Sequence, residues 1–486
     1  MEQNICTMIQ PTAPTSPVLV VISDHAPPVT ARPMEAHGFA DVMPAAKRVL
    51  EIGCGSGELA RLVRRTRPAT HWTGVGTGSA PDEPGLDRYI DLTSLSENGI
   101  DALSEAGQPD LIVLRDLSWL PRPSTLLKQL GRLLAPGGQM LLAFDNAASH
   151  GMLSKALQGD LSTGQAADGE AWPHDDVAYP RTWTLASVYK LLLDTGWSPT
   201  LVGQLEQHPI PAPLADAITH AARLAGSPAG SGDLARKITT PIVRCSRPFD
   251  SAPRLSGAAL FDVLVPTNHD TQHRLNVRQS PGLSEVGARV LTCRNAPNPA
   301  VALDASRRYL SKDWVLISHQ DVYFPTGFGE QLNAALQSIP SAAARQTILG
   351  FIGIGVNANR QPAPAGHVID RLHQADHPAS EAGLSLDELA IVIHRDSLLR
   401  IDPTLGWHLW ATDLCLQGVS GHQTLARVLR LPVFHNSHTG WTLPASFADS
   451  AERLVAKHSW MSPIHTLCGT IDAAFIASLR QKASTC

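Results

Sequence analysis

Two series of short apolar segments, each alternating with helix-like segments, restrict the possible fold of this chain more than any other feature. The first series comprises VLEIG, HWTGVG, DLIVL and QMLLAF, and the second comprises FDVLVP, ARVLTC, WVLISHQD, TILGFIGIGV and LAIVIHRD. Segments rich in branched side chains and bounded by Gly, Pro or Asp are typical of buried parallel strands. The sequence therefore predicts an α/β protein with two domains, and a doubly wound sheet in the first of them.

The boundaries between these parts follow from changes in composition. Residues 1–45 are rich in Pro, Ala and Thr, and we expect a loosely ordered leader with one apolar stretch at Val18–Ile22. The first α/β domain is expected over 46–205, a Pro-, Ala-, Gly- and Ser-rich linker over 206–258, and the second α/β domain over 259–486. Two domains also agree with the chain length, since single cores stop growing at roughly 250–300 residues.

Composition and charge exclude several classes of protein. The formal net charge is −5 and no basic stretch with interleaved aromatic residues occurs, so a nucleic-acid partner is not expected. The seven cysteines are scattered without a CxxC pair, which predicts a reduced, cytoplasmic protein without disulfides or a zinc site. The longest apolar runs are far shorter than the ~20 residues of a transmembrane segment, so any membrane contact would be peripheral.

The first candidate site is a glycine-rich turn after the first strand segment. Residues Val49–Glu58 read VLEIGCGSGE, which predicts a strand, a turn and the start of a helix. Glycines allow the backbone to pass close to a ligand, and the N-terminus of the following helix favours an anion such as a carboxylate. The acid of the strand, Glu51, can hold a ligand amine or order the turn. Closely packed strand–helix turns also use glycine, so the turn alone leaves a purely structural role open.

The segments downstream of this turn extend the pattern. DLIVLRDLSWLPRPSTLLKQLGRLLAPGGQMLLAF predicts a strand, a helix and an L-x-P-G-G turn before the next strand, and RTWTLASVYKLLLDTGW predicts a later helix. Together with EIGCGSG, over roughly residues 46–200, these segments resemble the class I S-adenosylmethionine-dependent methyltransferases. The resemblance implies a Rossmann-like fold with S-adenosylmethionine as cofactor. The residues that it implies as cofactor contacts are Glu51, Gly53, Gly55 and Gly57.

One position departs from the pattern of that family. The second strand segment ends at Gly76, where family members usually carry an acid that binds the ribose hydroxyls. The loss of hydrogen bonds to a charged acceptor costs ~1.5–3 kcal/mol each in a buried site. Asp82 and Asp91 are the candidates for a substitute acid. Because of Gly76, a binding or scaffolding domain without catalysis stays open as the alternative to an active methyltransferase.

Three polar sites follow or begin apolar segments in the C-terminal half. WVLISHQDV ends a strand at Asp321, HLWATDLCLQ places Asp413 at the start of an apolar helix, and VFHNSH ends a strand at His435. A carboxylate at a strand end of an open α/β sheet can hold a divalent cation against a diphosphate. Taken singly, these residues also fit a turn, a helix cap and a core histidine, respectively.

In this order, over about residues 259–445, the segments resemble the nucleotide-diphospho-sugar glycosyltransferases with the A-type fold, in particular the inverting, family-two-like group. FDVLVPTNHD resembles the first strand and the nucleotide-contacting loop. SHQDVYFP resembles a variant of the metal-binding Asp-x-Asp motif, with His319 in place of the first Asp. FHNSHTG resembles the distal histidine segment.

The resemblance also implies roles for individual side chains. Contacts to the nucleotide-sugar donor are implied for Asn268, Asp270 and Asp321. A Mn²⁺ or Mg²⁺ ion bound by Asp321 and His435 would offset charge on the departing nucleoside diphosphate. Asp413 would accept the proton of the acceptor hydroxyl as it attacks the anomeric carbon. The aromatic residues that can stack on a sugar ring, or pack in the core, are Trp407, His408 and Trp410.

The sequence as a whole therefore predicts a cytoplasmic, metal-assisted glycosyltransferase fused to a methyltransferase-like domain. The donor would be a nucleotide-diphospho-sugar, and the acceptor would be a glycan or a protein. If both domains are active, the tether between them raises the local concentration of a shared glycan intermediate. The alternative is a glycosyltransferase whose N-terminal domain serves only as a binding or scaffolding module.

Overall fold

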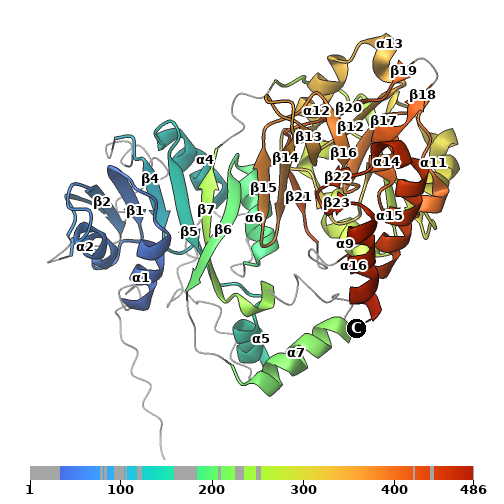
Figure 1. The fold of residues 1–486 in the computed structure, drawn as a ribbon. Helices are drawn as coiled ribbons and strands as arrows, with labels where there is room; N and C mark the ends of the chain where they lie inside the picture. The colour runs from blue at the N-terminus through green and yellow to red at the C-terminus, as the bar shows by residue number, and fades with distance from the viewer. Residues whose placement is uncertain are drawn as a thin grey trace, which may run out of the picture.

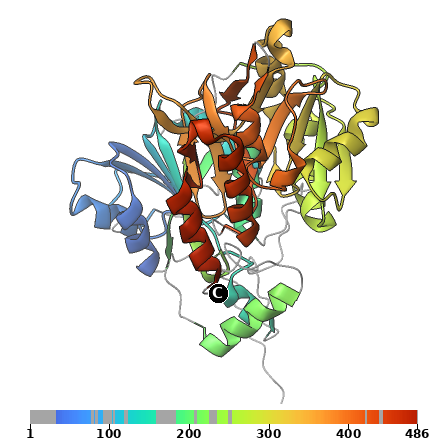
Figure 2. The same ribbon diagram turned by 45° about the vertical axis from the view of Figure 1, so that its right-hand side comes forward.

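The computed structural model shows two α/β domains that lie side by side (Figure 1, Figure 2). It describes residues 33–76, 80–81, 85–91, 103, 107–117, 123–157, 183–205, 210–224, 235–247, 253–419, 422–437 and 443–484. The apolar stretch Val18–Ile22 and the candidate acid Asp82 lie outside these residues. Among the helices of the described part, none has the length and hydropathy needed to cross a membrane.

The N-terminal domain is built on a seven-stranded sheet in the order β3-β2-β1-β4-β5-β7-β6. The strands are β1 (Arg48–Ile52), β2 (His71–Gly76), β3 (Arg88–Asp91), β4 (Leu111–Leu114), β5 (Gln139–Ala143), β6 (Ser198–Leu205) and β7 (Thr240–Ser246). Strands β1 to β5 pair in parallel, and β7 runs antiparallel to both of its neighbours. This order confirms the predicted doubly wound, Rossmann-like fold of the first domain.

Helices cover both faces of this sheet (Figure 1). They are α1 (Pro33–Val42), α2 (Glu58–Arg64), α4 (Pro123–Leu133) and α6 (Leu185–Asp194). Helices α5 (His150–Leu157) and α7 (Ala212–Leu224) pack against each other below the sheet in Figure 1. Alternate strand residues point to opposite faces, so Val49 packs with α1 and α2 while Leu50 packs with α4 and α6. Helix α6 begins at a capping box in which Thr184 accepts a hydrogen bond from the backbone N–H of Ser187.

Two predicted boundaries of the N-terminal domain are corrected by the structure. Residues 33–42 of the predicted leader form α1, whose Phe39 is buried against the sheet. Strand β7 falls inside the predicted linker over 206–258, and its residues Ile242 and Val243 are fully buried between β5 and β6. The surrounding Pro, Gly and Ser residues concealed this short apolar strand. The first domain therefore continues well beyond the predicted end at residue 205.

The C-terminal domain contains two larger mixed sheets. The main sheet has the strand order β20-β12-β17-β10-β8-β9, and the second sheet has the order β11-β21-β14-β13-β16, with β15 paired to β14. The strands of the main sheet are β8 (Phe261–Thr267), β9 (Val290–Arg294), β10 (Trp314–Ser318), β12 (Thr347–Gly350), β17 (Ala390–His394) and β20 (Leu425–Val428). Those of the second sheet are β11 (Val322–Tyr323), β13 (Ile352–Val356), β14 (Pro362–Asp370), β15 (Gln374–His377), β16 (Gly383–Leu386) and β21 (Val433–His435).

Helices and two short hairpins complete this domain. The helices are α9 (Asp270–Leu275), α10 (Pro281–Ser284), α11 (Pro299–Ser306), α12 (Phe328–Gln337), α13 (Ser341–Ala344), α14 (Trp410–Leu416), α15 (Ala445–Lys457) and α16 (Ala473–Ser484). The hairpins pair β18 (Gly418–Val419) with β19 (His422–Gln423) and β22 (Ile464–Thr466) with β23 (Gly469–Ile471). The domain is α/β as predicted, whereas its assignment to the A-type glycosyltransferase fold stays a prediction.

Candidate functional site

A cavity of about 600 Å³ lies in the C-terminal domain, where the main sheet meets the second sheet. The ends of β8, β10, β14 and β21 contribute to its wall, together with residues that precede α14 and the start of α15. The titratable groups that line it include His319, Asp321, Asp370, Asp387, Glu388 and His435. Cavities of ~300–1,000 Å³ with a few convergent polar groups are typical of small-molecule sites.

Three of these residues form a cluster with the composition of a metal site. His319, Asp321 and His435 each bring one potential ligand atom to within 4.8 Å of the others. The pairing of β11 with β21 explains this placement, because Val322 lies opposite His435 and the backbone N–H of Asn436 donates to the carbonyl of Asp321 at 2.9 Å. The predicted metal ligands Asp321 and His435 therefore lie together, and His319 joins them.

The charges within the cluster reinforce one another. Burial opposes ionisation of Asp321 and His435, but Nε2 of His435 lies 3.6 Å from Oδ1 of Asp321 and the mutual attraction outweighs burial. The pKa of His435 is thereby raised to about 9, and the pKa of Asp321 falls well below its usual range. Oδ2 of Asp370 lies 3.7 Å from Nδ1 of His435 and adds to the effect. Burial lowers the pKa of His319, so this imidazole is neutral at pH 7.

Two further acids of the cavity, Asp387 and Glu388, were missed by the sequence reasoning. Both acids precede β17. Because β17 runs antiparallel to β10, the start of β17 lies beside the end of β10. The backbone N–H of His319 donates to the carbonyl of Leu389 there at 2.8 Å. Burial, followed by the charge of Asp387, raises the pKa of Glu388 well above its usual range. Its Oε1 is buried and has no hydrogen-bond partner within the described ranges. The sequence signal that could have revealed them is a pair of acids directly before an apolar strand segment.

Of the residues predicted to contact the donor, some line the cavity and one does not. Asn268 lines the cavity, and its amide oxygen accepts a hydrogen bond from Nε2 of Gln320 at 2.9 Å. Asp270 instead begins α9 and pairs with Arg294 at 3.1 Å, apart from the residues described as lining the cavity. Of the predicted stacking residues, Trp407 and His408 line the cavity, whereas Trp410 is 2% exposed and packs in the core.

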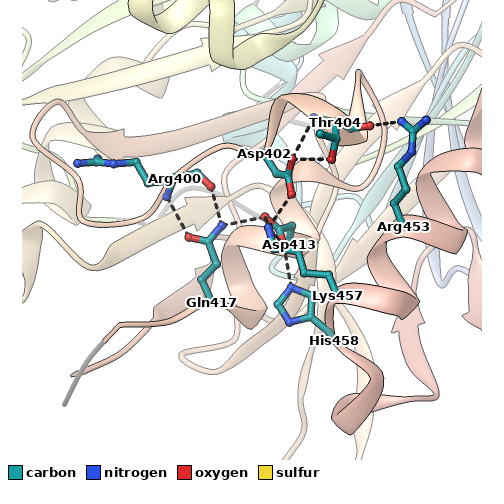
Figure 3. A network of polar contacts seen from close by, with 8 residues as sticks. All are labelled: Arg400, Asp402, Thr404, Asp413, Gln417, Arg453, Lys457 and His458. Carbon is teal, nitrogen blue, oxygen red and sulfur yellow. Dashed lines mark hydrogen bonds and ion pairs between the residues drawn. The ribbon is translucent and has the colours of Figure 1, made fainter.

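Asp413, the predicted proton acceptor, is fully buried and is not among the described residues that line the cavity. Figure 3 shows its polar partners. Its Oδ1 lies 2.9 Å from Nζ of Lys457 and 2.7 Å from Nε2 of His458, at the end of α15. Its Oδ2 accepts a hydrogen bond from Nε2 of Gln417 at 2.8 Å. Both carboxylate oxygens are therefore engaged inside the protein. This arrangement joins α14 to α15 and gives no support to proton transfer in the cavity.

The glycine-rich turn of the N-terminal domain has the backbone that its sequence requires. Gly53, Gly55 and Gly57 have φ angles of 80°, 51° and 73°, in the left-handed region that favours glycine. Glu51, however, is fully buried beneath the turn: Oε2 accepts a hydrogen bond from Nε1 of Trp72 at 2.8 Å, and Oε1 lies 3.5 Å from Arg115. Burial raises the pKa of Glu51 to about 7 against the opposing effect of Arg115. Of the two roles left open for Glu51, this placement favours ordering of the turn.

The position of the missing ribose-binding acid is also partly filled. A Cβ atom at Gly76 would lie 2.8 Å from the hydroxyl of Tyr89 on the neighbouring strand. Asp91, one of the candidate substitutes, pairs with Gly76 across β2 and β3. An acidic side chain at residue 76 would therefore compete with Tyr89 for the same space.

Comparison with known proteins identifies this domain. Residues 34–201 match the family model described as "Methyltransferase domain". The N-terminal part of the chain is therefore a methyltransferase domain, and its Rossmann-like sheet places it in class I.

The matches to individual relatives span only part of each relative's length. The chain is 34% identical over 108 residues to the ubiquinone biosynthesis O-methyltransferase of Nitrosococcus oceani. This match covers 20% of this chain and 44% of that protein. It is 31% identical over 101 residues to the trans-aconitate 2-methyltransferase of Methylobacterium nodulans, with 20% and 37% covered. The chain thus spans less than half the length of the curated relatives it matches. Among solved structures, the plantazolicin methyltransferase BpumL in complex with SAH is similar over 44% of this chain and 85% of that chain, with 14% identity and a TM-score of 0.27.

Proposed function

We propose that the C-terminal domain is a metal-dependent glycosyltransferase that uses a nucleotide-diphospho-sugar donor. One observation carries the proposal: the cluster of His319, Asp321 and His435 lies in the wall of a cavity of about 600 Å³ that holds further carboxylates. One carboxylate and two imidazoles form a donor set that suits Mn²⁺ better than Mg²⁺, which prefers oxygen ligands. A cation bound there would offset the negative charge of a diphosphate.

The residues around the cluster fit the binding of such a donor. Asn268 is held at the cavity by Gln320, whose Oε1 also accepts hydrogen bonds from the backbone N–H groups of Asn268 and His269 at 3.1 and 2.9 Å. The loop after β8 is thereby fixed next to the cluster, and its Asn268 is in place to bind the polar groups of a nucleotide. Trp407 and His408 offer flat surfaces on the cavity wall for a sugar or a base.

For the proton acceptor we propose Glu388 in place of Asp413. Glu388 lines the cavity, and the nearby backbone of Leu409 and Ala411 favours its charged form, against the effect of burial. Burial raises the pKa of this carboxyl group, so once ionised the carboxylate is a stronger base than an exposed glutamate. In the proposed step, the acceptor hydroxyl loses its proton to Glu388 while its oxygen bonds to the anomeric carbon. The bond from that carbon to the diphosphate breaks, and its electron pair leaves with the nucleoside diphosphate.

The test combines binding and turnover measurements on the full chain. A panel of nucleotide-sugars with Mn²⁺ is titrated by calorimetry, and donor hydrolysis is followed in parallel. We expect Asp321→Ala to lose Mn²⁺-dependent donor binding. We expect Glu388→Gln to keep donor binding and to lose roughly 10²–10⁴-fold in turnover. Asp304→Ala, an exposed position on α11 of the same domain, serves as the control. No Mn²⁺-dependent binding of any donor by the wild type would overturn the proposal.

A second activity is proposed for the N-terminal domain, because the match to the methyltransferase family includes the glycine-rich turn. We propose that this domain binds S-adenosylmethionine, with the backbone of Gly53, Gly55 and Gly57 against the cofactor and the hydroxyl of Tyr89 in place of the usual acid. When bound, the cofactor supplies a methyl group for transfer to an acceptor. Calorimetric titration of the full chain tests this: Tyr89→Phe is expected to weaken binding several-fold. A wild type without detectable binding would favour the alternative of a scaffolding domain.

A further inference from the structure

Two residues of the metal-binding cluster, Asp321 and His435, lie beside or in very short strands. β11 has two residues and lies at the edge of the described second sheet, next to β21, which has three. Their pairing joins Val322 to His435 and Tyr323 to Phe434. So few ladder hydrogen bonds leave the position of Asp321, immediately before β11, dependent on whatever else holds this edge in place.

Contacts from both domains hold this edge. Within the C-terminal domain, β21 pairs with β14, and Oγ of Ser280 accepts a hydrogen bond from the backbone N–H of Phe324 at 2.9 Å. The N-terminal domain adds contacts at β11 itself. The hydroxyl of Tyr323 donates to Oδ2 of Asp194 at 2.6 Å, and Oδ1 of Asp194 accepts from the backbone N–H of Thr326 at 3.2 Å. Asp194 is the last residue of α6. One carboxylate of the methyltransferase domain thus binds both the side chain of β11 and the backbone just beyond it.

The neighbouring strand is held from the same helix. The ring of Phe434 packs edge-on against that of Tyr189 in α6, with 5.8 Å between centroids. Phe434 is 0% exposed and belongs, with Tyr323, to the same hydrophobic core as the α6 side of the N-terminal sheet. Because successive strand residues point to opposite faces, burial of Phe434 under α6 directs His435 toward the cavity.

We propose that α6 of the methyltransferase domain positions Asp321 and His435, so that the metal site of the C-terminal domain depends on the N-terminal domain. This inference rests on the metal site of the proposed function. Asp194 and Tyr189 are positioning residues: neither lines the described cavity, and each acts through the residue it contacts. Residues that orient metal ligands typically change metal affinity 10–100-fold when they are altered.

The test uses Mn²⁺ alone and the full chain. Tyr323→Phe keeps the ring and removes only the hydroxyl that Asp194 binds, and Asp194→Asn changes the same contact from the other domain. Ser198→Ala is the matched control, since Ser198 crosses the same interface to His367 at 3.2 Å but contacts neither short strand. Mn²⁺ affinity is measured by calorimetry, and the ligand environment by the electron paramagnetic resonance spectrum of bound Mn²⁺. Thermal unfolding monitors the fold of each variant.

We expect Tyr323→Phe and Asp194→Asn to bind Mn²⁺ at least about tenfold more weakly than wild type, with altered spectra. Ser198→Ala should bind as wild type. Wild-type affinity and spectrum in a folded Tyr323→Phe or Asp194→Asn variant would overturn the inference and leave the metal site intact. A wild type that does not bind Mn²⁺ would overturn both the metal site and this inference.

Discussion

Replacing Asp413 with Asn tests whether this acid joins two helices or takes part in catalysis. The substitution keeps the shape of the side chain and removes its charge. In the wild type, the buried carboxylate faces Lys457 and His458 at the end of α15, and Gln417, which directly follows its own helix (Figure 3). Asn offers one acceptor atom where the carboxylate offers two, so at least one of these donors loses its partner.

The expected magnitude follows from the burial of each partner. Breaking a buried ion pair by removing one charge costs about 3–5 kcal/mol. Lys457 is 37% exposed and keeps Asp402 at 2.8 Å, so its share is reduced by solvent. The side chain of His458 is 7% exposed, and a stranded buried polar group costs about 1–3 kcal/mol. We therefore expect Asp413→Asn to lower the free energy of unfolding by about 2–4 kcal/mol.

Urea unfolding of the full chain, followed by tryptophan fluorescence, measures this loss. Mn²⁺ binding is measured on the same samples and should equal that of the wild type, because Asp413 lies apart from the described cavity wall. Asp402→Asn is the control: it loses one partly exposed contact to Lys457 and should cost about 1 kcal/mol or less. Unchanged stability in Asp413→Asn, together with lost turnover, would refute the structural role and restore the catalytic one.

Three further predictions concern pH, backbone geometry and thiol reactivity. Mn²⁺ affinity should rise about tenfold per pH unit up to about pH 8, because His435, with a pKa raised to about 9, must release its proton to bind metal; a calorimetric pH series with flat affinity would contradict this. Gly366→Ala should lose at least ~3 kcal/mol of stability, since φ is 101° and the new Cβ would meet a carbonyl oxygen at 2.1 Å, whereas Gly406→Ala, with φ of 65° and open space, should lose only ~1 kcal/mol in the same denaturation assay. Buried Cys54, whose pKa burial raises to about 12, should resist iodoacetamide at pH 8 while half-buried Cys293 is modified, as site-resolved mass spectrometry would show; equal labelling would contradict the described burial.

The sequence predicted β1, β2, β4 and β5 of the first domain because each is a short apolar run bounded by Gly, Pro or Asp. It did not predict β3, β6 or β7. The second domain was harder. The single segment TILGFIGIGV forms two strands, β12 and β13, which belong to different sheets and change over at Phe351. Strand β14 begins with PAPAG, a composition typical of a loop. Such strands are fixed by their neighbours in the folded domain, and local propensity does not reveal them.

The candidate site shows the same division between local and long-range causes. Asp321 and His435 were predicted together because each follows an apolar strand. Glu388 escaped notice because it precedes its strand, and only the antiparallel direction of β17 brings it to the cavity. Asp413 was assigned to catalysis by resemblance to the glycosyltransferases, and its partners Lys457 and His458, 44 and 45 residues further along the chain, were not recognised. Its charge could not be recognised as neutralised until those residues were placed.

The position of β7, between β5 and the edge strand β6, determines how this protein can be divided for experiments. Strands β5 and β6 are joined in the sheet only through β7, which the chain adds last. A fragment that ends near residue 205 would leave β5 and β6 with unpaired edges, and exposed edges of this kind invite aggregation. Ligand binding by the methyltransferase domain alone would therefore have to be studied on fragments that extend through Ser246.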